Sequence, residues 1–291
     1  MDYVEPLFRP PSEARSLLIQ ATVGCSHNAC TFCAMYAGKS FRVKPLNTVL
    51  EDIDEAAASG YRFERVFLMD GDALVLKTDH LLAILHAIRD KLPRVQRVAV
   101  YGDARSVTHK GDDELAALRE AGLGLVYHGI ESGDDQVLSL LNKGSDAAAA
   151  RDMARRIKAA GMGYSAIVLL GAGGKELCTR HAEATARHLN AVQPDFVGAL
   201  MLTLVPGTPL AELARKGAFT LPDKWGLLEE LKTLIEGLSL NRCRFHANHA
   251  SNYLPIRASL PEDKTRVLTL INHVLATRDE SMLKPEFLRG L

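Results

Sequence analysis

The sequence predicts an α/β fold built around a mostly parallel sheet. Six short apolar runs, rich in Val, Ile, Leu or aromatic residues, alternate with amphipathic segments of helical period, and turn residues separate them. Six strand–helix units in a row imply a parallel sheet with right-handed crossovers. Six such units either close into a partial barrel with an open side or form a flat, doubly wound sheet. Periodicity alone does not separate these two forms.

The expected strands are short and mostly apolar, as in a parallel sheet that is covered on at least one face. They span residues 16–22, 65–69, 95–101, 124–130, 163–170 and 196–205. The expected helices between them begin or end at proline or glycine: the first follows Pro45, the second stops before Pro93 and the third stops at Gly122. These helices span residues 46–59, 79–92, 113–121, 145–160 and 176–191.

The alternation of strands and helices lapses after Leu210. Two helical patterns, 222–240 and 261–277, then flank a polar segment at 242–253. We therefore expect a core domain of residues 1–210 and a mainly helical C-terminal extension of residues 211–291 that packs on this core.

Composition excludes some classes of protein. The chain has 291 residues, of which 47% are hydrophobic, so it is long enough for one large domain or for a domain with a smaller appendage. Lysine and arginine number 35, as do aspartate and glutamate, which disfavours nucleic acid as a partner. No apolar run approaches the roughly 20 residues that a membrane helix needs, and the first residues lack a signal-peptide pattern. We expect a cytoplasmic protein without a membrane partner.

Three of the five cysteines crowd into one loop directly after the first expected strand. Residues 24–33 read Gly-Cys-Ser-His-Asn-Ala-Cys-Thr-Phe-Cys, which places Cys25, Cys30 and Cys33 close together. Three thiolates at this spacing can bind three of the four irons of a [4Fe–4S] cluster and leave the fourth iron open. Zinc is the alternative, with His27 as a fourth ligand, although structural zinc sites usually draw two ligands from a distant segment.

This cysteine loop and the strand ends that follow it resemble the radical S-adenosylmethionine superfamily, from about Ser16 to Leu210. The resemblance is closest to the oxygen-independent coproporphyrinogen oxidase-like and Elp3-MiaB-like subgroup. The usual family spacing between cysteines is three and two residues, whereas this chain has four and two. The resemblance implies a partial (β/α)6 TIM-like barrel, a [4Fe–4S] cluster and S-adenosylmethionine as cofactors.

The first half of the cofactor site follows from the resemblance by position. Phe32 precedes the last cysteine, where the backbone of family members contacts the adenine. Asp70, Gly71 and Asp72 end the second strand in the place of a Gly-Gly-Glu-like turn that binds the methionyl ammonium, with Asp72 at the carboxylate position. Tyr101 ends the third strand, at a position that often faces the ribose.

The second half lies at the ends of the later strands. Glu131 takes the place of the polar residue that binds the ribose hydroxyls, and Lys143, twelve residues later, that of the cation for the methionyl carboxylate. Gly171 matches the glycine turn under the adenine. Val205 opens a Val-Pro-Gly-Thr-Pro turn like that of the same subgroup.

The resemblance also implies a reaction. A reduced cluster donates one electron to S-adenosylmethionine, the C5′–S bond breaks, and a 5′-deoxyadenosyl radical abstracts hydrogen from a substrate. We expect a small-molecule or cofactor-precursor substrate, and a reductant such as flavodoxin or ferredoxin. By analogy with barrel enzymes, the substrate should enter at the carboxyl ends of the strands.

The C-terminal segment 242–253 supplies the candidates for a substrate pocket, namely His246, Asn248, His249 and Asn252. The sequence does not identify a catalytic residue beyond these candidates. Two alternatives remain open for the segment. It is either a closing segment whose polar groups are satisfied internally, or part of a non-catalytic, cluster-bearing heme carrier or chaperone with His246 and His249 as heme ligands.

Overall fold

The computed structural model describes residues 1–290, which fall into two compact units. The first unit comprises Met1–Asn28, Met35–His128 and Asp152–Tyr164. The second comprises Ala29–Ala34, Gly129–Arg151 and the chain from Ser165 onward. The cysteine loop therefore contributes to both units.

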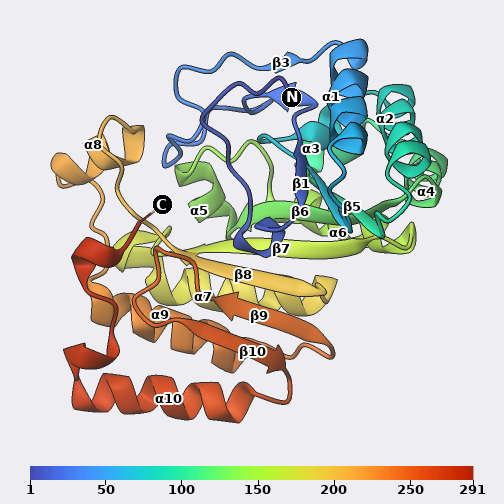
Figure 1. Cartoon of the computed structure of the whole chain (residues 1–291). Coiled ribbons are helices and arrows are strands. Elements are labelled where there is room, and N and C mark those ends of the chain that lie inside the picture. The colour runs from blue at the N-terminus through green and yellow to red at the C-terminus, as the bar shows by residue number, and fades with distance from the viewer. Residues whose placement is uncertain (291) are drawn as a thin grey trace. The chain divides into compact units, whose positions relative to one another are not determined.

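The first unit contains a parallel sheet and a separate short antiparallel pair. In the sheet, β1 pairs with β4, β4 with β5 and β5 with β6, all parallel (Figure 1). The bounds of these strands are β1 Leu17–Ile19, β4 Arg65–Leu68, β5 Arg97–Tyr101 and β6 Leu123–Glu131, and the last three residues of β6 belong to the second unit. The antiparallel pair consists of β2 (Thr22–Val23) and β3 (Arg42–Val43).

Amphipathic helices pack against this sheet. Helix α1 (Leu46–Ala58) begins directly after Pro45 and buries Val49, Ile53 and Ala56, which share one helical face. It packs on β1 and on α2. The helical segments that belong wholly or partly to this unit are η1 Pro11–Glu13, α1, η2 Ala73–Val75, α2 Thr78–Lys91, α3 Ala104–Thr108, α4 Asp112–Glu120 and α6 Ala147–Ala159.

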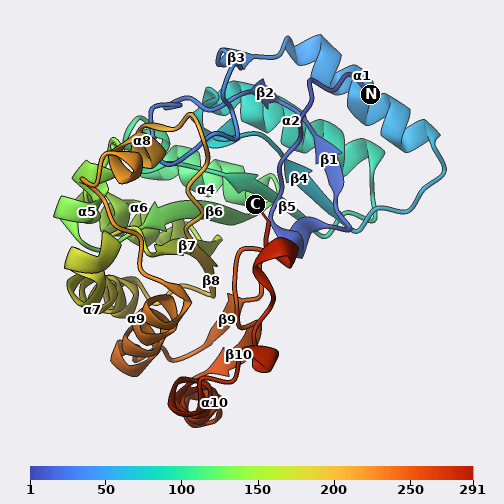
Figure 2. The ribbon, with the colours of Figure 1, turned by 90° about the vertical axis from the view of Figure 1, so that its left-hand side faces the viewer.

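The second unit carries the later strands. Strands β7, β8 and β9 run parallel, and β10 returns antiparallel to β9 (Figure 2). Their bounds are β7 Gly163–Leu170, β8 Phe196–Met201, β9 Cys243–Ala247 and β10 Ile256–Leu260, and the first two residues of β7 belong to the first unit. Helix α7 packs on α9, and α10 packs on α9 and β10. The helical segments are α5 Asp135–Leu140, α7 Gly174–Val192, α8 Pro209–Arg215, α9 Lys224–Gly237, α10 Lys264–Thr277, η3 Glu280–Met282 and η4 Glu286–Leu288.

The predicted α/β class is confirmed, and the differences lie at the ends of elements. The run 16–22 divides into β1 and β2, because after Gln20 the chain leaves the sheet and pairs with β3. The run 196–205 ends at Met201, shortly before Pro206, which has no N–H for a strand ladder. The C-terminal extension contains β9 and β10 in addition to its helices, and the boundary at residue 210 stays a prediction. Within residues 1–290, no helix has both the length and the apolar character needed to cross a membrane.

Helix α7 contains a buried histidine, His188, from which we predict that the stability of the fold depends on pH. His188 is 2% exposed, and neither ring nitrogen has a hydrogen-bond partner among the described residues. Burial, and then the charge of Arg151, lower its pKa to about 4. The unfolded chain binds a proton near the ordinary histidine pKa of about 6.5, so it takes up more protons than the folded chain between these two values. Stability should therefore fall as the pH drops from about 6.5 to about 4.

Replacing His188 with methionine should remove up to about 3 kcal/mol of this acid-side loss, because methionine has no charge to bury. Urea unfolding at pH 7 and at pH 4.5 measures the effect. His86→Met, at an exposed position of α2, serves as the control and should leave the pH dependence intact. An equal acid-side loss in the His188→Met variant would contradict this assignment.

Candidate functional site

The three cysteines of the loop are divided between the two units. Cys25 follows β2 in the first unit, whereas Cys30 and Cys33 lie in the 29–34 segment of the second. None of the five cysteines forms a disulfide, and the three in the loop are partly exposed, whereas Cys243 is buried. The N–H of Cys33 donates to the carbonyl of Cys30 at 3.3 Å, which closes a tight turn between these two thiols.

The turn that ends β4 packs directly on the first cysteine. Gly71 lies so close that a Cβ atom there would stand 2.6 Å from the Cβ atom and 2.9 Å from the Cα atom of Cys25. The N–H of Gly71 donates to the carbonyl of Gly24 at 3.0 Å. Only glycine fits this position, so the close approach of strand end and cysteine depends on it.

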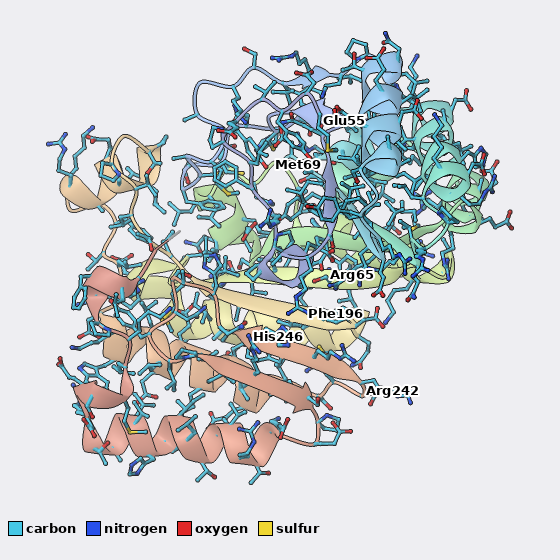
Figure 3. The ribbon with its side chains drawn as sticks, in the orientation of Figure 1. Glu55, Arg65, Met69, Phe196, Arg242 and His246 are labelled. Carbon is cyan, nitrogen blue, oxygen red and sulfur yellow. The ribbon has the colours of Figure 1, made fainter. Side chains whose placement is uncertain are left out.

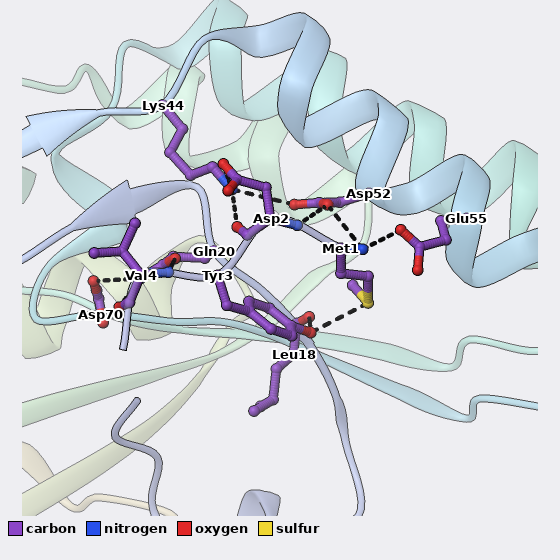
Figure 4. A network of polar contacts seen from close by, with 10 residues as sticks. All are labelled: Met1, Asp2, Tyr3, Val4, Leu18, Gln20, Lys44, Asp52, Glu55 and Asp70. Atoms are coloured by element: carbon purple, nitrogen blue, oxygen red, sulfur yellow. Dashed lines mark hydrogen bonds and ion pairs between the residues drawn. The ribbon is translucent and has the colours of Figure 1, made fainter. Parts of the chain in front are cut away.

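Asp70 braces the start of the cysteine loop. Its Oδ2 accepts from the N–H of Gly24 and from Nε2 of Gln20, both at 2.9 Å. Gln20 in turn accepts from the N–H of Val4 at 2.8 Å, so the N-terminal segment joins the same network (Figure 4). Asp70 adopts a left-handed backbone conformation with φ of 71°. Burial raises the pKa of its carboxyl, which the two hydrogen bonds oppose.

Asp72 has one buried carboxylate oxygen that no group in the described part of the chain contacts by a hydrogen bond. Its Oδ2 accepts from the hydroxyls of Ser26 at 2.6 Å and Ser106 at 2.5 Å. Its Oδ1 is buried and unpaired among the described residues. Burial raises the pKa of this carboxyl to about 6, and the two hydroxyls act in the opposite direction. A buried carboxylate with an available oxygen is suited to accept a hydrogen bond from a cation.

The neighbouring short helix α3 holds other groups of the loop. Asp103 caps this helix by accepting from the N–H of Arg105 at 3.1 Å, and it also accepts from Nε of Arg105 at 2.8 Å. A guanidinium nitrogen of Arg105 lies 3.1 Å from Nδ1 of His27, so the side chain of Arg105 positions the ring of His27. Tyr101, at the end of β5, packs edge-to-face on Phe67 with ring centroids 5.1 Å apart.

In the second unit, backbone contacts fix the segment that carries the other two cysteines. Thr31 donates from its N–H to the carbonyl of Leu141 and from its hydroxyl to the carbonyl of Leu140, each at 2.9 Å. The carbonyl of Thr31 accepts from the N–H of Leu210 at 2.9 Å. Phe32 packs against an apolar cluster that includes Leu169, Ala172, Leu202 and Leu210.

The predicted ribose acid and the predicted cation are neighbours. Nζ of Lys143 lies 3.3 Å from Oε1 of Glu131, and both side chains are nearly buried. Glu131, at the end of β6, has a φ of 58°, which is uncommon for a residue other than glycine. The structure therefore brings an acid and a base together at this strand end.

A buried carboxylate from α9 holds the glycine turn after β7. Gly171 has a φ of 85°, and a Cβ atom there would stand 2.8 Å from a methyl group of Leu227. Its N–H donates to the carboxylate of Glu230, with both oxygens within 3.0 Å. Glu230 also contacts Nδ1 of His181 at 2.6 Å, and Nε2 of His181 lies 3.3 Å from the carbonyl oxygen of Glu131. One acid thus supports both strand ends.

The remaining predicted residues lie after β8 and around β9. The carbonyl of Val205 accepts from the N–H of Thr208 at 3.1 Å and from its hydroxyl at 2.7 Å, which closes the turn. His246 lies within β9, and Asn248 follows its end. His249 and Asn252 belong to the loop after β9, which Nδ2 of Asn252 fixes to β8 through the carbonyl of Ala199 at 3.0 Å.

Sequence reasoning missed the groups that support the site. Ser26 and Ser106 on Asp72, and His181 and Glu230 behind Gly171, were not candidates. Only Glu230 carried a usable signal, because it occupies the apolar face of a predicted helix, where a charged residue needs a buried partner.

Comparison with known proteins identifies the family. The family model described as "Radical SAM superfamily" matches residues 19–186, which is more than half of the chain. The chain belongs to the radical SAM superfamily. The match includes the cysteine loop and extends past the glycine turn at Gly171, so the resemblance predicted from these motifs is confirmed.

Individual relatives of the superfamily agree with this assignment. A tRNA-2-methylthio-N(6)-dimethylallyladenosine synthase from Alteromonas mediterranea is 26% identical over 219 residues, which are 70% of this chain and 43% of that protein. The chain therefore spans less than half the length of this curated relative. Coproporphyrinogen III oxidase (HemN) from Escherichia coli has a similar fold, with a TM-score of 0.59, 17% identity, and coverage of 77% of this chain and 53% of that one.

A third radical SAM protein is the methyltransferase TsrM from Kitasatospora setae, whose structure contains tryptophan and an S-adenosylmethionine analogue. It has a TM-score of 0.57 and 22% identity, and the match covers 71% of this chain and 40% of that one. These likenesses confirm the predicted partial-barrel fold class.

The residues present fit the cofactors of a radical SAM protein. Within the described part of the chain, no three His, Cys, Asp or Glu side chains gather as a ready metal site, and the loop cysteines belong to different units. The donor set itself is nevertheless suitable, because three thiols outside any disulfide are ligands of an iron–sulfur cluster. Beside Cys25, the unpaired oxygen of Asp72 suits the ammonium group of S-adenosylmethionine.

Proposed function

We propose that this chain is a radical SAM enzyme that holds a [4Fe–4S] cluster through Cys25, Cys30 and Cys33 and cleaves S-adenosylmethionine reductively. One observation carries the proposal: Gly71 packs on Cys25, and the next residue, Asp72, keeps a buried oxygen without a partner among residues 1–290. One short turn therefore places a carboxylate that can bind a cation close to a proposed cluster ligand.

Each residue then has a defined task. When bound, a reduced cluster supplies the electron that splits the C5′–S bond and generates a 5′-deoxyadenosyl radical able to take hydrogen from a substrate. Asp72 accepts hydrogen bonds from the methionyl ammonium, and Lys143 pairs with the methionyl carboxylate. Glu131 accepts hydrogen bonds from the ribose hydroxyls. The backbone around Phe32, Gly171 and Val205 binds the adenine.

We further propose a small-molecule or cofactor-precursor substrate and a soluble reductant such as flavodoxin or ferredoxin. The equal numbers of acidic and basic residues support a small molecule over a nucleic acid. The partly exposed loop thiols, which form no disulfide, support a reducing compartment such as the cytoplasm.

Replacing Asp72 with asparagine should weaken S-adenosylmethionine binding by about tenfold or more, because a charge-assisted hydrogen bond to the ammonium is lost. The cluster should still assemble, since no thiol changes. Equilibrium binding to anaerobically reconstituted protein measures the effect, and iron and sulfide analysis checks the cluster. Asp79→Asn, at an exposed position of α2, is the matched control. Unchanged affinity in Asp72→Asn would exclude Asp72 as the ammonium receptor.

A further inference from the structure

Strands β7 to β10 of the second unit have two faces of different character. On one face, alternate residues such as Val197, Phe245 and Ala258 are fully or almost fully buried. The other face, here called the cationic sheet face, is only partly covered. It carries Ile167, Gly198, Leu200, Arg244, His246 and Arg257.

The strand register sets these side chains beside one another. His246 pairs with Gly198 of β8 on one side and with Arg257 of β10 on the other. Arg244 pairs with Phe196 of β8, and Figure 3 shows Phe196 and His246 on neighbouring strands. Burial lowers the pKa of His246, and the charges of Arg257 and Arg244 lower it further, so both guanidinium groups act on the same ring.

Both guanidinium groups are oriented by neighbours that do not neutralise them. With its amide oxygen turned toward β10, Asn248 accepts from Nε of Arg257 at 2.9 Å and from Nη2 at 3.1 Å. The guanidinium of Arg244 lies over the ring of Phe196, 5.8 Å from its centroid. The paired positions of β7 to β10 on this face include no aspartate or glutamate. Two oriented positive charges without an acid on the same face form a receptor for an anion.

Apolar surface adjoins these charges on the same face. Ile167 pairs with Gly198, and Leu200 lies two residues further along β8. A Cβ atom on Gly198 would contact only methyl and methylene carbons of Ile167 and Leu200, at 3.9 Å. The surface of the sheet next to His246 is therefore apolar, and no side chain projects from it at Gly198. The face thus joins a cationic end to an apolar end.

We propose that the cationic sheet face binds the substrate as an organic anion. Its carboxylate or phosphate group pairs with Arg244 and Arg257, and its apolar part lies over Ile167 and Leu200. This inference rests on the proposed function only in that it takes the bound anion to be the substrate. The anion site itself follows from the residues of the face.

Phenyl phosphate and phenylacetate are suitable probes, with benzyl alcohol as the neutral analogue. Calorimetric titration of the full chain should show saturable binding of one anion per molecule. The Arg244→Gln/Arg257→Gln double variant should bind the anions about tenfold more weakly or worse. Arg187→Gln removes an exposed arginine of α7 that pairs with Glu183, and it should leave the affinity unchanged. The tighter of the two anions identifies the group as phosphate or carboxylate.

Equal anion affinity in the double variant and the unchanged chain, or no saturable anion binding to the unchanged chain, would overturn the proposal. Arg257→Lys keeps the charge and should retain part of the affinity, which separates loss of charge from misfolding. A second assay separates this inference from the proposed function. This assay measures the cleavage of S-adenosylmethionine by the reconstituted, unchanged chain. If the unchanged chain binds the probes but never cleaves S-adenosylmethionine, the proposed function fails and the anion site remains.

Discussion

Cys30→Ala protein is expected to assemble no stable [4Fe–4S] cluster and to lose reductive cleavage of S-adenosylmethionine by about a hundredfold or more. In the proposed site, three thiolates bind three irons and leave the fourth open, so removal of one thiolate leaves two ligands for four irons. Cys25→Ala and Cys33→Ala should behave in the same way. Iron and sulfide content and the yield of 5′-deoxyadenosine after anaerobic reconstitution measure the effect.

The chain provides matched controls outside the loop. The thiol of Cys178 donates to the carboxylate of Glu230 at 3.2 Å, and burial together with the charge of Glu230 raises its pKa, so it stays a thiol. Cys243 is buried in β9. Alanine at either position should leave the iron content unchanged. A full cluster in Cys30→Ala, or loss of the cluster in Cys243→Ala, would refute the ligand assignment.

Glu230→Gln protein should lose about 3 kcal/mol of its unfolding free energy, because this change breaks a buried, fully engaged carboxylate network. The side chain of Glu230 is completely buried and accepts from the N–H of Gly171 while contacting His181 and Cys178. Glutamine replaces one accepting carboxylate oxygen with an NH2 group, which is a hydrogen-bond donor. At least one of the donors around Glu230 then lies opposite another donor and loses its hydrogen bond. Urea unfolding of the unloaded chain measures the loss.

The adjacent residue supplies the control for this prediction. Glu229 is exposed and lies 3.9 Å from Lys232, so Glu229→Gln should change the unfolding free energy by less than about 0.5 kcal/mol. Because Glu230 supports Gly171 and, through His181, the backbone of Glu131, its replacement should also weaken S-adenosylmethionine binding. Equal stability of Glu229→Gln and Glu230→Gln would show that the network contributes nothing.

The sequence predicted the regular part of the fold because strands of a parallel sheet and their covering helices have strong periodicity. The ends of the elements were harder to predict, because they depend on residues that are distant in the sequence. Strand β1, for example, ends just before Gln20, whose side chain forms hydrogen bonds with Val4 and Asp70. The short helix α3 was also not predicted from the sequence. It begins where Asp103 caps the N–H of Arg105, a local signal that is weak without a long apolar face behind it.

The candidate site divides in the same way. Motif positions such as Cys25, Gly71 and Gly171 are visible because glycine and cysteine have few interchangeable roles. The supporting contacts of Ser106 and His181 depend on side chains that meet only after folding, across 34 residues to Asp72 and 49 residues to Glu230. No local spacing encodes such pairs, so the structure was needed to find them.

Product analysis after a single anaerobic incubation tests the central claim most directly. Reconstituted protein, reduced with dithionite and given S-adenosylmethionine, should release methionine and 5′-deoxyadenosine in equal amounts. Neither product from protein with an intact and reduced cluster, whether or not organic acids are supplied, would contradict the account. Purified chain that binds zinc with four ligands and takes up no iron or sulfide would contradict it equally.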